Sequence, residues 1–73
     1  MLTAAQCRAA RGLLNWKQKD LAEYAGVTAV TIFNFEASKT SPHNSTVKIL
    51  KETFEKAGVI FIDDNGGGVK LKG

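Results

Sequence analysis

Two short stretches with helical spacing of small and apolar residues meet at a glycine near the middle of this sequence. The spacing predicts one helix over residues 18–25 and another over about 29–37. Gly26 stands where a left-handed backbone would end the first helix, and Thr28 stands where a hydroxyl would cap the second. The small Ala22 lets two helices cross closely. The sequence therefore predicts two helices joined by a tight turn, a helix-turn-helix.

The rest of the sequence predicts a small, mainly α domain around this unit. Thr3 and Gln6 have the spacing of a capping box, which predicts the start of a first helix. A fourth helical stripe ends at Gly58, and beyond it two apolar stretches flank a glycine-rich turn, which predicts a hairpin. We therefore expect a mainly α fold, with a four-helix domain that contains the helix-turn-helix over residues 1–58 and a short C-terminal β-hairpin over residues 59–73.

Length and composition exclude several classes of protein. The chain has 73 residues and one cysteine, so it can form one small core and no internal disulfide. No apolar stretch reaches the roughly 18 residues of a membrane span, and we expect no signal peptide and a cytoplasmic location. No residues have the pattern of a catalytic set, a metal site or a cofactor fingerprint, so we predict no enzyme activity, no cofactor and no metal. No small-molecule effector is evident. The net charge of +3 is compatible with nucleic acid bound through placed contacts.

The middle of the chain also matches a known pattern position by position. It has the form Gln18-x-x-Leu21-Ala22-x-x-Ala25-Gly26-Val27-Thr28-x-x-Thr31-Ile32-x-x-Phe35-Glu36. This pattern resembles the phage-repressor-like, or Xre-type, helix-turn-helix family of bacterial regulators, and the resemblance extends over about residues 5–57. It implies a sequence-specific transcriptional regulator, by default a repressor. Such a protein would bind double-stranded DNA as a homodimer, on a short palindromic operator, with its second motif helix in the major groove.

The resemblance also implies which residues contact DNA. Base contacts would come from the outward side of the recognition helix, at Thr28, Ala29, Val30, Phe33 and Asn34. Phosphate contacts would come from the start of the second helix and the loop after the recognition helix, at Lys17, Gln18, Lys39, Thr40 and Ser41. Arg11 and Glu36 match a structural pair that joins the first and third helices. The sequence departs from the family at Lys17, where a Ser or Thr cap is usual, and in its unusually apolar recognition helix.

Two sets of apolar residues allow further interpretations. The Val30–Phe33 face is also compatible with a protein-interaction module, such as an antitoxin-like protein or an adaptor, on the same fold. The segment 59–62 is apolar on both faces, so covering the core with one face leaves Ile60 and Ile62 in water. Together with Ile49, these residues predict a homodimer interface. The competing interpretation is that the hairpin folds back and hides Ile60 within its own chain.

Overall fold

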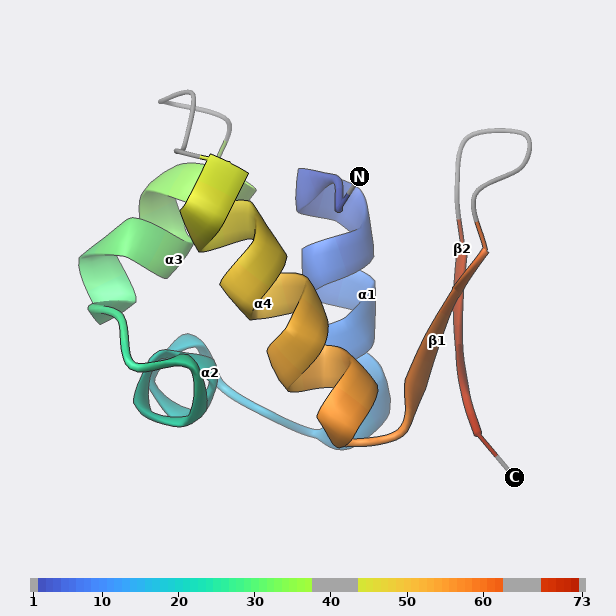
Figure 1. The fold of residues 1–73 in the computed structure, drawn as a ribbon. Coiled ribbons are helices and arrows are strands. Elements are labelled where there is room, and N and C mark those ends of the chain that lie inside the picture. The colour runs from blue at the N-terminus through green and yellow to red at the C-terminus, as the bar shows by residue number, and fades with distance from the viewer. Residues whose placement is uncertain (1, 38–43, 63–67, 73) are drawn as a thin grey trace.

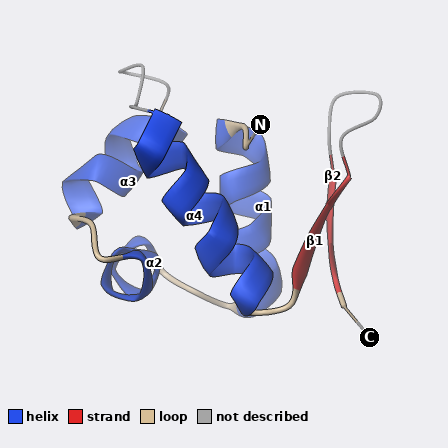
Figure 2. Cartoon of the chain, viewed as in Figure 1, coloured by secondary structure: helices blue, strands red, loops and turns tan. Residues whose placement is uncertain are grey.

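The computed structural model describes residues 2–37, 44–62 and 68–72, which form a layered arrangement of helices with a hairpin at one end (Figures 1 and 2). The elements within these residues are α1 (Ala4–Leu14), α2 (Gln18–Ala25), α3 (Ala29–Glu36), α4 (Asn44–Lys56), β1 (Val59–Ile62) and β2 (Gly68–Leu71). The predicted fold class, four helices followed by a hairpin, is confirmed. None of the described helices is both long enough and apolar enough to cross a membrane.

Local hydrogen bonds fix where α1 and α2 begin. The Thr3 hydroxyl accepts the Gln6 backbone N–H at 3.0 Å, and the Gln6 side-chain oxygen accepts the Thr3 N–H at 3.0 Å, which completes the predicted capping box. Lys17 precedes α2 and has no side-chain oxygen to offer as a cap. The Asp20 carboxylate instead accepts the Lys17 backbone N–H at 2.9 Å, and its charge suits the N-terminal end of a helix.

The turn between α2 and α3 has the geometry that its sequence predicts. Gly26 has a φ of 75°, and its N–H donates to the Ala22 carbonyl at 2.9 Å. Thr28 caps α3, because its hydroxyl accepts the Thr31 backbone N–H at 3.2 Å. The two helices are therefore joined by the predicted tight turn, and the helix-turn-helix is confirmed.

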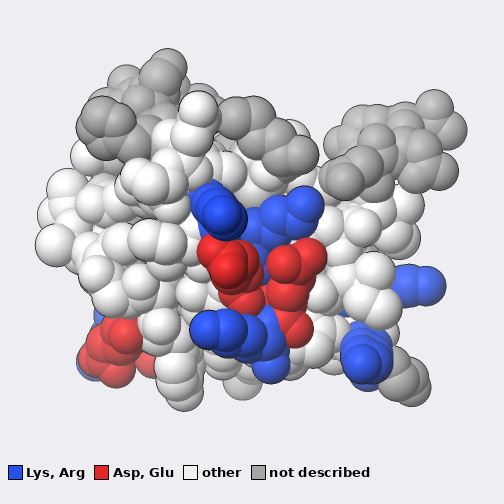
Figure 3. Space-filling model, in the orientation of Figure 1, with Lys and Arg blue, Asp and Glu red and all other residues white. Residues whose placement is uncertain are grey.

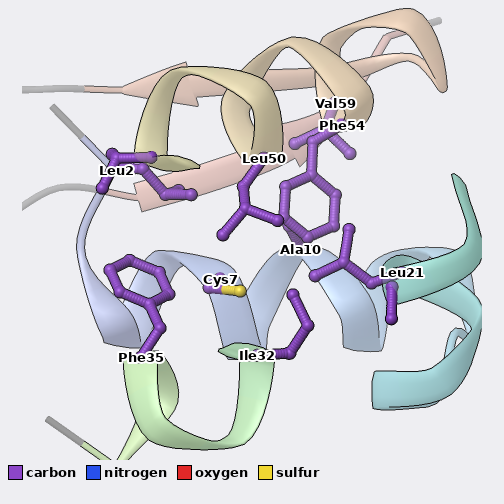
Figure 4. Close-up of a cluster of buried hydrophobic side chains, with 11 residues drawn as sticks. Leu2, Cys7, Ala10, Leu21, Ile32, Phe35, Leu50, Phe54 and Val59 are labelled. Carbon is purple, nitrogen blue, oxygen red and sulfur yellow. The ribbon is translucent and has the colours of Figure 1, made fainter. Parts of the chain in front are cut away.

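A single apolar cluster joins all four helices and the hairpin (Figure 4). Its fully buried members are Cys7, Leu21, Ile32, Leu50 and Phe54, together with Ala10. The Trp16 ring stacks with the Phe54 ring, with centroids 5.9 Å apart, and with the Tyr24 ring at 4.6 Å. Trp16 thus covers the core and holds α2 against α4.

The hairpin closes the other side of the core with one of its two faces. The strands are antiparallel with the register Val59↔Leu71, Ile60↔Lys70, Phe61↔Val69 and Ile62↔Gly68. Val59 is buried, and Phe61 and Val69 pack against the core. Ile60 and Ile62, on the opposite face, stay 38% and 39% exposed. The hairpin therefore does not hide Ile60 within its own chain.

Replacement of Gly26 by alanine tests the left-handed turn. No atom lies within 4 Å of the position that a Cβ would take, so the cost comes from the backbone alone. We expect Gly26→Ala to lower the free energy of unfolding by about 1–2 kcal/mol. Gly12→Ala is the matched control, since Gly12 also has open space but lies within α1. This control should raise stability by about 0.5–1 kcal/mol. Urea denaturation measures both, and equal effects would contradict the turn geometry.

Candidate nucleic-acid interface

The outward side of α3 carries most of the predicted base-contact residues. Helical spacing turns Ile32, Phe35 and Glu36 into the domain, where they are buried. The opposite side exposes Thr28 and Ala29, with Val30 at 66% and Phe33 at 48% exposed. Asn34 lies half-buried on the flank between the two sides. The structure thus brings four of the predicted residues to one exposed surface and places Asn34 at its border.

A hydroxyl pair at the start of α3 adds a residue that was not among the predicted contacts. The Thr28 and Thr31 hydroxyl oxygens are 3.0 Å apart, and Thr28 also accepts the Thr31 backbone N–H. One hydroxyl must donate to the other, so the pair keeps one hydroxyl hydrogen for an outside acceptor. The signal was present in the sequence as two threonines three positions apart at a helix start.

The predicted phosphate contacts fall into two groups. Lys17 is exposed directly before α2, where Asp20 already accepts its backbone N–H, so Lys17 can bind an anion through its ammonium group. Gln18 is half-buried, and its side-chain nitrogen donates to the Glu36 carboxylate at 3.2 Å. It therefore has a structural partner that the sequence did not reveal. Lys39, Thr40 and Ser41 lie outside the described residues.

The Glu36 carboxylate joins three helices at the inner end of α3. Arg11 binds it with two nitrogens, Nε to Oε2 and Nη2 to Oε1, both at 2.6 Å. The Cys7 thiol donates to Oε2 at 3.1 Å, and Gln18 donates to Oε1. Arg8, which was not among the predicted site residues, donates to the Glu36 backbone carbonyl at 2.5 Å. The structural pair implied by the family resemblance is thus formed, as part of a larger network from α1 and α2.

This network sets the charge states of its members. Burial alone would raise the pKa of the Glu36 carboxyl, but hydrogen bonds from Arg11, Cys7 and Gln18, with the Arg11 charge, hold that pKa below its ordinary value of 4.5. Burial raises the pKa of the Cys7 thiol, and its hydrogen bond to Glu36 raises it further. Glu36 is therefore ionised at neutral pH, and Cys7 remains a protonated donor.

The three residues of the predicted dimer interface do not form one patch. Ile60 and Ile62 share the outer face of the hairpin, whereas Ile49 lies on α4. The Lys51 ammonium lies 6.0 Å from the Phe61 ring centroid, so the Lys51 side of α4 adjoins the hairpin. Ile49 precedes Lys51 by two residues, which is about 200° around a helix. It is 41% exposed, on the side of α4 away from the hairpin.

No metal centre is found within the described part of the chain, where no group of three or more His, Cys, Asp and Glu side chains could hold an ion. The candidate interface instead consists of the exposed side of α3, which carries both hydroxyl and apolar side chains, and of Lys17 at the start of α2. It can bind a polyanion through Lys17 and contact a groove through α3.

Loss of the Glu36 carboxylate should destabilise the fold. Glu36→Ala leaves the half-buried Arg11 charge without its partner, so we expect the free energy of unfolding to fall by about 3 kcal/mol, while the exposed Glu23→Ala changes it by less than about 0.5 kcal/mol. Because the folded pKa of Glu36 is lowered, its stabilisation is complete above pH 4.5 and is lost as the pH falls through the folded value. Denaturation curves from pH 3 to 7 should show this acid loss in the native protein and not in Glu36→Ala. The same acid slope in both proteins would contradict the assignment.

Comparison with known proteins agrees with this geometry. A family model described as helix-turn-helix matches residues 8–58, which include the later part of α1, all of α2, α3 and α4, and the Arg11–Glu36 pair. A search of curated proteins found no matching relative. The family match covers more than two thirds of the chain, and the two helices around Gly26 form its motif in the structure. This protein therefore belongs to the Xre-type helix-turn-helix family of DNA-binding regulators.

Proposed function

We propose that this protein is a transcriptional repressor that binds a short palindromic operator, as a homodimer, through the major groove. The observation that carries the proposal is the exposed side of α3, with Thr28, Ala29 and Val30 in solvent beside the cationic start of α2. In this arrangement α3 enters the groove, while Lys17, Lys39, Thr40 and Ser41 contact phosphates. The Gln18 side-chain nitrogen has two hydrogens, and one of them is donated to Glu36. The second hydrogen can be donated to a DNA phosphate near the one that Lys17 contacts.

The side chains on α3 favour a particular kind of readout. Ala29 and Val30 have no polar group, so they can contact only the methyl group of thymine in the major groove. The Thr28–Thr31 pair supplies a hydroxyl donor, and Asn34 can bind adenine through two hydrogen bonds. We therefore expect half-sites rich in A·T pairs. Selectivity would depend on a few polar contacts from α3.

A second candidate function is binding to another protein through α3. The observation that favours it is the exposure of two large apolar side chains, Val30 and Phe33, on one helix. Exposed apolar patches on small domains are frequent interaction sites. This surface would then contact a partner rather than a groove, as in antitoxin-like proteins and adaptors.

Selection of bound sequences from a random DNA pool at moderate salt separates the two functions. A repressor of this kind should enrich two inverted half-sites whose centres lie about 34–36 Å apart, or a multiple of this. Thr28→Val, which removes the hydroxyl of the α3 cap, should shift the enriched bases. Failure to enrich any sequence would contradict DNA recognition and favour protein binding.

The salt dependence of DNA binding tests the phosphate contacts. Lys17→Ala and Lys39→Ala should each weaken binding to all sequences alike, and each should reduce the slope of log K against log salt by about 0.9. Lys72→Ala is a matched control, since Lys72 follows the hairpin at the other end of the molecule. Titrations at several salt concentrations measure these slopes. Unchanged slopes in both test variants would remove the proposed anchoring.

Replacement of Asn34 tests base readout at the border of the exposed surface. Asn34→Ala should weaken binding to the enriched operator by about 1–3 kcal/mol and relax selectivity at one base pair of each half-site. The measurement is a set of competition titrations against operators changed at single positions. If affinity falls equally for every sequence, Asn34 positions the helix and does not read a base.

A further inference from the structure

The β1 strand has a free edge that faces away from β2. Lys72 donates its backbone N–H to the Gly58 carbonyl at 2.7 Å, so the hydrogen-bonded pairs of this antiparallel ladder fall on alternate residues from Gly58 onward. The N–H and C=O groups of Val59 and Phe61 therefore point outward from the hairpin. Among the described residues, no hydrogen-bond partner meets them.

The two edges of the hairpin differ in charge. The β2 strand carries Lys70, and Lys72 directly follows it, a pattern by which proteins keep a strand edge from pairing with another chain. The β1 strand has only apolar side chains, from Val59 to Ile62. Nothing of this kind protects the β1 edge, so it is the edge suited to a partner strand.

The side of α4 next to β1 carries charges of both signs. Lys51 lies over the Phe61 ring, and helical spacing places Lys48, Glu52 and Glu55 on the same flank. Figure 3 shows acidic and basic side chains gathered side by side on this face of the molecule. The only ion pair within the described ranges is that of Arg11 with Glu36, so these four charges form no ion pair with one another there.

We propose that a second copy of this chain pairs with the β1 edge, so that the two β1 strands form the centre of a four-stranded antiparallel sheet. Across the two-fold axis each α4 runs antiparallel to the α4 of the other copy, as each β1 does to the other β1. The lysines in the first half of one α4 then oppose the glutamates in the second half of the other. This charge complementarity favours a second copy over a different protein. The inference deepens the homodimer of the proposed function by naming its surface, and it does not depend on DNA binding.

The free backbone groups also fix the register of this sheet. The outward N–H and C=O groups of both copies are hydrogen-bonded when Val59 of each copy pairs with Phe61 of the other. Ile60 then lies on the two-fold axis opposite Ile60 of the second copy, in a pair with Cα atoms about 4.5 Å apart. The two copies of Ile62 lie four positions apart, or about 13 Å. Lys70 of each copy lies in an outer strand, away from its counterpart.

This geometry also suits an operator with two-fold symmetry. The hairpin lies at one end of the molecule, the pair α1 and α4 lies in the middle, and α2 and α3 lie at the other end (Figure 1). The axis of such a sheet is perpendicular to its surface. Rotation about it leaves both α3 helices on the side away from the hairpins, where both can face one duplex.

Disulfide trapping tests the register directly. Ile60→Cys should form a disulfide-linked dimer under mild oxidation, because its Cα separation suits a disulfide. Ile62→Cys is the matched control, on the same face and equally exposed, and Leu71→Cys reports on the β2 edge. Neither control should crosslink, and the native chain should not, since Cys7 is fully buried. The proposal is overturned if either control crosslinks as fast as Ile60→Cys. It is also overturned if none of the three variants crosslinks.

A charge exchange on α4 provides a second measurement, by sedimentation without DNA. Lys48→Glu should raise the dimer dissociation constant by roughly ten-fold, because it sets like charges against each other at two symmetric places. The double variant Lys48→Glu with Glu55→Lys should return the constant to within about three-fold of the native value. A double variant that dimerises as weakly as the single variant overturns the α4 contact.

A chain that sediments as a monomer but still enriches an operator would refute this interface alone. A crosslinked dimer that enriches no DNA would refute only the proposed function.

Discussion

The buried carboxylate of Glu36 is the contact on which the arrangement of the helices depends. An eight-residue helix such as α3 is not stable alone, so its orientation comes from what holds its ends. At its inner end Glu36 receives Arg11 and Cys7 from α1 and Gln18 from α2. A buried charge is tolerated only when it is fully paired, and the two nitrogens of Arg11 supply that pairing. The direction of the exposed side of α3 is thus set by directional polar contacts as well as by apolar packing.

Features fixed by neighbouring residues could be predicted from the sequence. The capping box at Thr3, the left-handed Gly26 and the Thr28 cap each depend on residues at most four positions apart in the sequence. Contacts between distant segments could not be predicted in this way. Leu2 is buried although it precedes the first helical stripe, and Arg8 binds the end of α3, 28 residues away. No local pattern indicates either contact.

The candidate site shows the same division. Once Ile32 and Phe35 are assigned to the core, the helical period alone predicts that Val30 faces solvent, and the structure places it there. The position of Ile49 relative to the hairpin residues could not be predicted either, for a different reason. A helix has two flanks beside its buried stripe, and the sequence does not show which flank the hairpin will cover. The contact between Lys51 and Phe61 settles that choice and leaves Ile49 on the other flank.

The hairpin shows how a very short chain can close its core and still offer a surface to a partner. A fifth amphipathic helix in this place would turn its single apolar stripe to the core and its polar side to water. A strand alternates sides at every residue, so Val59 and Phe61 cover the core while Ile60 and Ile62 face outward. Lysines lie in and after β2, whereas β1 has none, and the proposed interface uses the β1 edge. Four consecutive apolar residues can therefore complete the domain and direct its association with a second copy, provided that their backbone groups at the free edge are satisfied across the two-fold axis.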